Sequence, residues 1–137
     1  MRRYGKLMPT RLLLPVWLMV VGISIVGCGE QAPTDQLRES ALQAYHAERE
    51  FTKHISPSEY PEAFHDGHRK VAGGLDILLE RHPDASDGLR SLLVDLRDGE
   101  QQLASGRLGQ AEAEALRKRQ QEYWLHLENE TLPPDYR

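Results

Sequence analysis

Cysteine is almost absent from this sequence. Cys28 is the single cysteine among 137 residues, so no intramolecular disulfide can form, and a domain that follows it must be stabilised by packing. If Cys28 is itself modified, that domain also has no thiol nucleophile.

The usual catalytic signatures are missing as well. The sequence contains no Gly-x-Ser-x-Gly nucleophile elbow, no Gly-rich phosphate loop ending in Lys-Ser/Thr, and no His-Glu-x-x-His motif. It also contains no internal repeat and no segment with the two-residue alternation of a half-buried strand. These absences favour a non-enzymatic, helical protein.

Basic residues are in deficit. The chain has 17 Lys and Arg against 21 Asp and Glu, and four of the basic residues lie within positions 1–11. The part after Cys28 therefore keeps 13 basic and 21 acidic residues, a formal charge of −8. Such a body is not expected to bind nucleic acid, because the phosphate contribution to affinity would be repulsive.

Positions 1–27 have the layout of a secretory signal peptide. Positions 1–11 are basic and lack acids, an apolar run begins at Leu12, and small residues precede Cys28. A membrane-spanning helix needs about 20 predominantly apolar residues, whereas the run from Leu12 to Gly27 has 16 positions and contains Pro15. A signal peptide is therefore preferred to a membrane span.

The end of this run, Ile25-Val26-Gly27-Cys28, resembles the lipobox of bacterial lipoproteins. The resemblance implies a diacylglyceryl group on the Cys28 sulfur, an acyl chain on its amine, and a mature chain that starts at Cys28 and is anchored in a lipid bilayer. Gly29, where lipoproteins retained in the inner membrane typically carry aspartate, implies an outer-membrane protein that faces the periplasm. The alternative is a cysteine that happens to follow an ordinary signal peptide.

Residues 28–34 are expected to form the lipidated end and a short tether, and residues 35–130 one helical domain. Apolar residues at spacings of three and four predict helices from Asp35 to His54, from Ser58 to His82, from Asp84 or Ser86 to Ser105, and from Leu108 onward. Thr34 or Asp35 and Ser58 are the predicted N-caps of the first two helices, and Gly106 is predicted to end the third. The apolar faces predicted to be buried include Phe51, Tyr60, Leu89, Leu92, Leu93, Leu96, Leu103, Ala111 and Ala115. Helices joined by short loops pack as antiparallel neighbours. The predicted fold is therefore all-α, an up-down-up-down four-helix bundle followed by a C-terminal tail at 131–137.

Two glycines stand side by side inside the second predicted helix. Each costs about 1 kcal/mol relative to alanine in a helix interior. Gly73 and Gly74 are therefore expected to serve a close helix crossing, with a ligand near the backbone as the alternative. Whether they also kink the helix stays open.

Histidines suggest a metal site. His65 and His68 lie three residues apart on one predicted helix, and Glu62 precedes His65 as in one Glu-x-x-His motif of the di-iron carboxylate bundles. The second such motif that a di-iron site needs is absent. His65 and His68, with His82 or His126, are the candidate ligands, and the alternative is that His68 is a hydrogen-bonded core residue. No cofactor is required, although a metal ion remains an option.

The last predicted helix faintly resembles that of the small periplasmic four-helix b-type cytochromes. Leu108, its alanine-rich turns and the pair Arg119 and Tyr123 carry the resemblance. That family implies haem held by a methionine and a histidine, but the chain after Cys28 has no methionine, and His126 is offset from the matching position.

The leading functional hypothesis is a membrane-anchored lipoprotein that acts as a non-enzymatic docking or accessory module for an assembly of the cell envelope. Its expected partners are the bilayer, through Cys28, and an envelope protein. The rival hypothesis is a small metal- or haem-binding protein on the periplasmic side.

Overall fold

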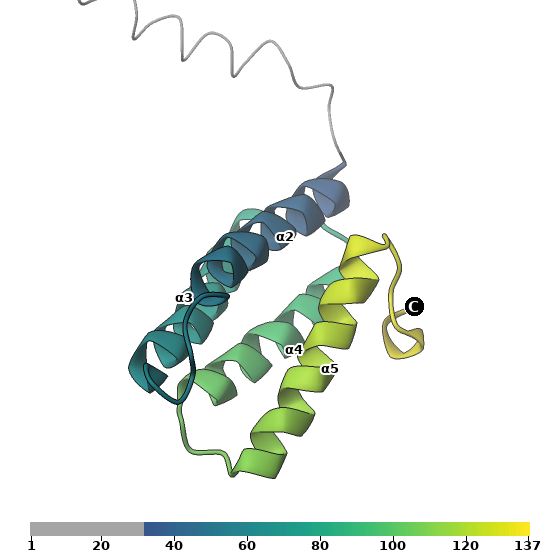
Figure 1. The fold of residues 1–137 in the computed structure, drawn as a ribbon. Helices are drawn as coiled ribbons and strands as arrows, with labels where there is room; N and C mark the ends of the chain where they lie inside the picture. The colour runs from purple at the N-terminus through teal and green to yellow at the C-terminus, as the bar shows by residue number, and fades with distance from the viewer. Residues whose placement is uncertain (1–31) are drawn as a thin grey trace, which may run out of the picture. The chain divides into compact units, whose positions relative to one another are not determined.

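The computed structural model describes residues 32–137. The predicted signal peptide, Cys28 and its lipidation lie outside the described residues. The described part forms four helices and one short 3-10 helix (Figure 1): α2 Pro33–Thr52, α3 Pro61–Arg81, α4 Asp87–Ala104, α5 Gln110–Glu128 and η1 Pro134–Tyr136. Residues 32–137 contain no strand, and the predicted all-α four-helix bundle is confirmed.

Two helices begin with a proline and not with the polar cap predicted for them. Proline suits the first helical position because its missing N–H would have no partner there. α2 begins at Pro33, ahead of the predicted caps, and Thr34 instead accepts a hydrogen bond from the Ser86 N–H at the start of α4 (2.9 Å). α3 begins at Pro61, three residues after the predicted Ser58.

The turn between α4 and α5 follows the sequence more closely. Gly106 has a φ of +64° and follows the last turn of α4, as predicted for a glycine at the end of a helix. α5 begins at Gln110, two residues later than predicted, where the Glu112 carboxylate accepts a hydrogen bond from the Gly109 N–H (3.3 Å). The carboxylate thereby satisfies a backbone donor that a helix start leaves free.

The core is built mainly from leucines, and α4 supplies more of them than any other helix. The five leucines predicted to be buried on this helix are all buried, at 6% exposure or less: Leu89, Leu92, Leu93, Leu96 and Leu103. Leu37 and Ala41 of α2, Leu75 of α3, and Trp124 and Leu127 of α5 complete its centre. None of the helices within residues 32–137 is long and apolar enough to cross a membrane.

Other predicted core residues are wrong. Phe51 and Tyr60 are about 60% exposed, because they lie at the last turn of α2 and in the following loop, where no helix covers them. Ala111 and Ala115 are exposed on α5. The first half of α5 therefore contributes less to the core than its alanine pattern predicts.

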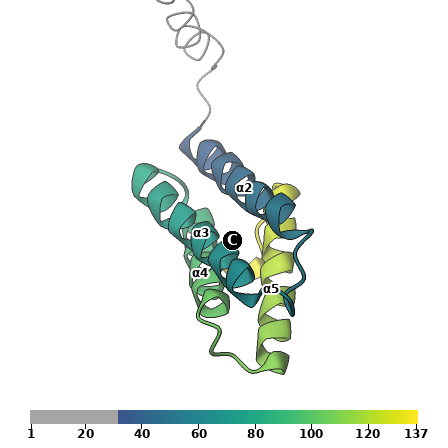
Figure 2. The ribbon, with the colours of Figure 1, turned by 60° about the vertical axis from the view of Figure 1, so that its left-hand side comes forward.

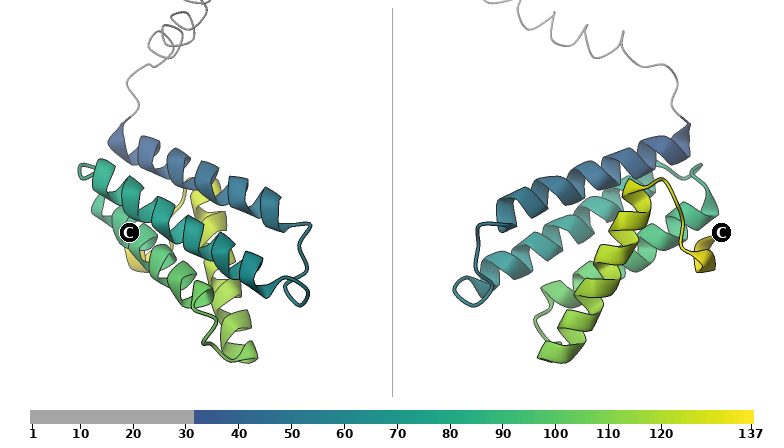
Figure 3. Two further views of the ribbon diagram at one scale, coloured as in Figure 1. Left: turned by 90° about the vertical axis from the view of Figure 1, so that its left-hand side faces the viewer. Right: turned by 45° about the vertical axis from the view of Figure 1, so that its right-hand side comes forward.

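Contacts between helix ends show how the chain is arranged. The starts of α2 and α4 share the Thr34 to Ser86 hydrogen bond, and Arg38 near the start of α2 pairs with Glu130 just after α5 (3.6 Å). At the opposite end, His65 near the start of α3 packs against Gly106 after α4. These contacts bring the starts of α2 and α4 and the end of α5 together, and the start of α3 next to the end of α4; the up-down-up-down order stays a prediction. Figures 2 and 3 show α2, α3 and α4 side by side and α5 inclined across them.

The C-terminal segment, predicted only as a tail, folds back on the bundle. The Tyr136 hydroxyl donates a hydrogen bond to Asp95 of α4, and its ring meets Tyr123 edge to face at 5.8 Å. Gly88 makes room for this segment, since a β-carbon there would lie 2.2 Å from the Tyr136 carbonyl oxygen.

The adjacent glycines of α3 do not have the predicted role. α3 is continuous from Pro61 to Arg81. A β-carbon at Gly73 would meet nothing within 4 Å, and one at Gly74 would make only an ordinary contact with Ala44 at 3.9 Å. Neither glycine is required by a close helix crossing.

Candidate functional site

A pocket of about 240 Å³ opens into the bundle between α2 and α5. It lies in the half of the bundle that contains the end of α2 and the beginning of α3. All four helices contribute to its lining, which consists of Tyr45, Glu48, Arg49, Thr52, Phe64, Gly67, His68, Val71, Glu100, Leu103, Arg117, Gln120, Gln121 and Trp124. Aromatic and aliphatic side chains thus surround a small group of polar ones.

A chain of hydrogen bonds crosses the floor of this pocket. His68 Nδ1 lies 2.5 Å from Glu100 Oε2, and the other carboxylate oxygen accepts a hydrogen bond from Gln120 Nε2 (3.3 Å). Gln120 Nε2 also donates to the Leu96 carbonyl oxygen (2.8 Å). Glu100 and Gln120 are 4% and 3% exposed, so the network is sheltered from water. A hydrogen bond is stronger in such an interior than it is in water.

Two glycines make this arrangement possible. A β-carbon at Gly99 would lie 2.4 Å from Gln120 Oε1, so the carboxamide can approach α4 only because residue 99 has no side chain. A β-carbon at Gly67 would lie 3.1 Å from Thr52 Cγ2 and 3.2 Å from Glu48 Oε1. The missing side chains of Gly99 and Gly67 therefore leave space at the pocket for polar side chains of neighbouring helices.

Four buried polar atoms at the pocket have no hydrogen-bond partner within residues 32–137. They are Glu48 Oε1, His68 Nε2, Gln120 Oε1 and Trp124 Nε1. A buried donor or acceptor without a partner costs about 1–3 kcal/mol, and most such groups in folded proteins are satisfied. Because all four of these residues line one cavity, a polar molecule bound there could supply the missing hydrogen bonds.

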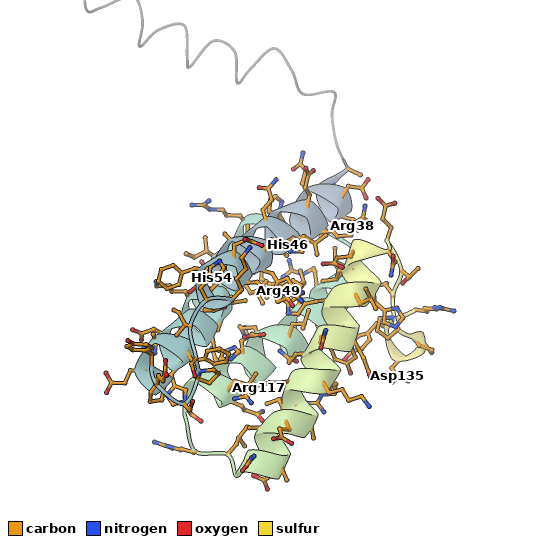
Figure 4. The ribbon with its side chains drawn as sticks, in the orientation of Figure 1. Arg38, His46, Arg49, His54, Arg117 and Asp135 are labelled. Atoms are coloured by element: carbon orange, nitrogen blue, oxygen red, sulfur yellow. The ribbon has the colours of Figure 1, made fainter. Side chains whose placement is uncertain are left out.

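Two arginines stand at the same pocket (Figure 4). Arg49 of α2 lies between α2 and α5, and Arg117 of α5 lies over the Phe64 ring, 5.6 Å from its centre. Arg49 donates a hydrogen bond to the Tyr45 hydroxyl (3.3 Å). In the described part of the chain, neither guanidinium is paired with a carboxylate.

The Tyr45 ring stacks on Trp124, with ring centres 4.3 Å apart. Burial raises the pKa of the Tyr45 hydroxyl, and Arg49 beside it partly opposes the shift. Tyr45 therefore remains a neutral phenol, with its hydroxyl available as a hydrogen-bond partner at the pocket.

The histidines predicted as metal ligands each have different neighbours. His65 packs against Gly106, whereas His68 bonds to Glu100. His82 ends α3, where its carbonyl oxygen accepts a hydrogen bond from Arg90, and His126 lies 2.9 Å from the Thr131 hydroxyl. No group of three or more His, Cys, Asp or Glu side chains suited to a metal ion occurs in residues 32–137. The metal site therefore stays a prediction, and His68 is a hydrogen-bonded histidine at the edge of the core.

Sequence reasoning missed most of the pocket. Glu100 and Gln120 are the buried polar residues of helices whose other polar residues are exposed or only partly buried, and nothing local in the sequence distinguishes them. The one available signal was Gly99, a glycine inside a strongly helical segment directly before Glu100. A glycine inside a helix costs about 1 kcal/mol relative to alanine, so its position is a signal that close packing can explain.

Fold and site together define a small four-helix-bundle protein with an internal pocket lined by aromatic and polar side chains. Comparisons with protein-family models, with curated proteins and with solved structures give no match to this chain.

Proposed function

We propose that the chain is a lipid-anchored, non-enzymatic lipoprotein whose helical bundle acts as a docking or accessory module of a cell-envelope assembly. The supporting observation is the short connection between the lipobox-like cysteine and the bundle. α2 begins at Pro33, five residues after Cys28, and an extended chain spans at most about 3.5 Å per residue. A bundle acylated at Cys28 is held within about 17 Å of the bilayer.

Lipidation is tested on the full chain in a bacterial host by metabolic labelling with palmitate and by membrane fractionation. Label and membrane association should both disappear in Cys28→Ser. A matched variant adds Ser58→Cys to Cys28→Ser, which restores one thiol in an exposed loop and should restore neither property. Cys28→Ser protein that still takes up label and stays with the membrane would refute the anchor.

Docking is tested at the exposed apolar side chains. Phe51 and Tyr60, 60% and 61% exposed, lie at the end of the bundle opposite the start of α2. Photo-crosslinkers at these positions should capture one defined envelope protein, whereas a crosslinker at Leu125, which is 54% exposed near the other end, should not. Equal capture from all three positions would contradict a specific docking surface.

A further inference from the structure

The pocket offers hydrogen-bonding atoms whose roles are fixed by their surroundings. Both hydrogen bonds of Gln120 Nε2 are made to Leu96 and Glu100, so Gln120 Oε1 remains as an acceptor. The Glu100 carboxylate occupies His68 Nδ1, which leaves Nε2 at the pocket. Trp124 Nε1, on a side chain that is 1% exposed, can only donate. This is a preformed polar site in an apolar surround, the usual composition of a small-molecule pocket.

Two arginines without ion-pair partners favour an anion at the pocket. Within residues 32–137, Arg49 and Arg117 line the pocket and neither is paired with a carboxylate. Glu48 and Glu100 equal them in number, but the Glu100 carboxylate is already bonded to His68 and Gln120. Guanidinium groups bind carboxylates in a planar, two-point geometry.

The apolar lining and the volume set the size of the occupant. Tyr45, Phe64, Leu103 and Trp124 supply aromatic and aliphatic walls. A cavity of about 150 Å³ takes benzene, so the 240 Å³ here accommodates a molecule of about ten non-hydrogen atoms. Such a ligand has room for one ring or a short chain next to its charged group.

We propose that this pocket binds a small organic monocarboxylate with an apolar body, whose carboxylate is held by Arg49 and Arg117 and whose body lies against the aromatic walls. This binding activity is independent of the proposed anchoring at Cys28, since every residue that carries it lies within the bundle.

The test uses the full chain in detergent micelles with Trp17→Phe, which makes Trp124 the only tryptophan. Phenylpropionate is titrated while the fluorescence of Trp124 is recorded, with phenylpropanol and phenylpropylamine as neutral and cationic comparators and empty micelles as the blank. Phenylpropionate should give a saturable change at lower concentration than either comparator. Arg117→Gln should weaken it about tenfold or more, since a hydrogen bond to a charged group contributes about 1.5–3 kcal/mol.

Arg69→Gln is the matched control, because Arg69 lies exposed on α3 and pairs with Asp66 outside the pocket. It should leave the titration unchanged. No saturable response to phenylpropionate would overturn the proposal, and so would an equal response to phenylpropylamine. A loss of affinity in Arg69→Gln as large as that in Arg117→Gln would also overturn it. A saturable response to Zn²⁺ alone that disappears in His68→Ala would overturn it in favour of a metal site.

Discussion

At the scale of single residues, the glycines that matter are not the conspicuous ones. Gly73 and Gly74 attract notice as a pair, yet Gly73 faces open space. Gly99 has no glycine neighbour in the sequence, and a β-carbon there would lie 2.4 Å from a buried carboxamide oxygen. The sequence shows that a glycine interrupts a helix, but only the neighbouring helix decides what its missing side chain permits.

Substitution by alanine should change the free energy of unfolding in opposite directions at Gly73 and at Gly99. Gly73→Ala should stabilise the fold by about 0.5–1 kcal/mol, because it improves helix propensity and meets no neighbour. Gly99→Ala should destabilise it by about 1–3 kcal/mol, because the Gln120 carboxamide loses its place against α4 and leaves buried groups unsatisfied.

The measurement is the free energy of unfolding from urea denaturation of both variants, followed by far-UV circular dichroism. The double variant Gly99→Ala with Gln120→Ala serves as control, since it removes the colliding side chain and should recover part of the loss. Equal effects of the two single substitutions would contradict this account of Gly99.

At the scale of elements, the C-terminal segment shows how a short piece without a clear pattern becomes ordered. Tyr136 bonds to Asp95, and the segment packs where Gly88 leaves space on α4. Burial and then the Asp95 hydrogen bond raise the pKa of the Tyr136 hydroxyl well above its ordinary value of 10.0. The neutral phenol is therefore the form that docks.

The docking of this segment should weaken in alkaline solution. A group whose folded pKa is raised contributes stability that is fully present below its unfolded pKa and is lost as the pH rises above it. The melting temperature of the parent chain should therefore approach that of Tyr136→Phe as the pH rises through 10.0, the ordinary tyrosine value. Thermal unfolding of both chains across this range is the measurement.

Tyr60→Phe is the control, because its exposed ring makes no contact with the tail, and its melting curve should follow that of the parent at every pH. A difference between the parent and Tyr136→Phe that stays constant above pH 10.0 would show that the hydroxyl does not control docking.

At the scale of the whole molecule, one leucine-rich core joins all four helices. Leu92 is completely buried in it, whereas Ile77 is 50% exposed. Leu92→Ala should cost about 2–5 kcal/mol through lost burial and a cavity, and Ile77→Ala much less. For a domain of this size, such a loss is a large fraction of a total stability of about 5–15 kcal/mol.

The bundle should also unfold as one unit. In chains that carry Trp17→Phe, chemical denaturation followed by Trp124 fluorescence and by far-UV circular dichroism should give coincident transitions with and without Leu92→Ala, and Leu92→Ala should shift both to lower denaturant. Transitions that separate would show that α5, which carries Trp124, unfolds independently of the other helices.

The sequence by itself determined the all-α class, the number of helices and the buried leucines of α4, because these depend on spacings of three and four along a helix. It also placed Gly106 at a helix end, since that position needs a residue tolerant of a positive φ. The tertiary structure alone decided that Glu100, Gln120 and His68 meet at a pocket, that Phe51 and Tyr60 are exposed, and that residues 134–136 dock on α4. Helix periodicity reports which face of a helix is apolar, whereas the partner of a polar side chain depends on how helices distant in sequence are inclined to one another.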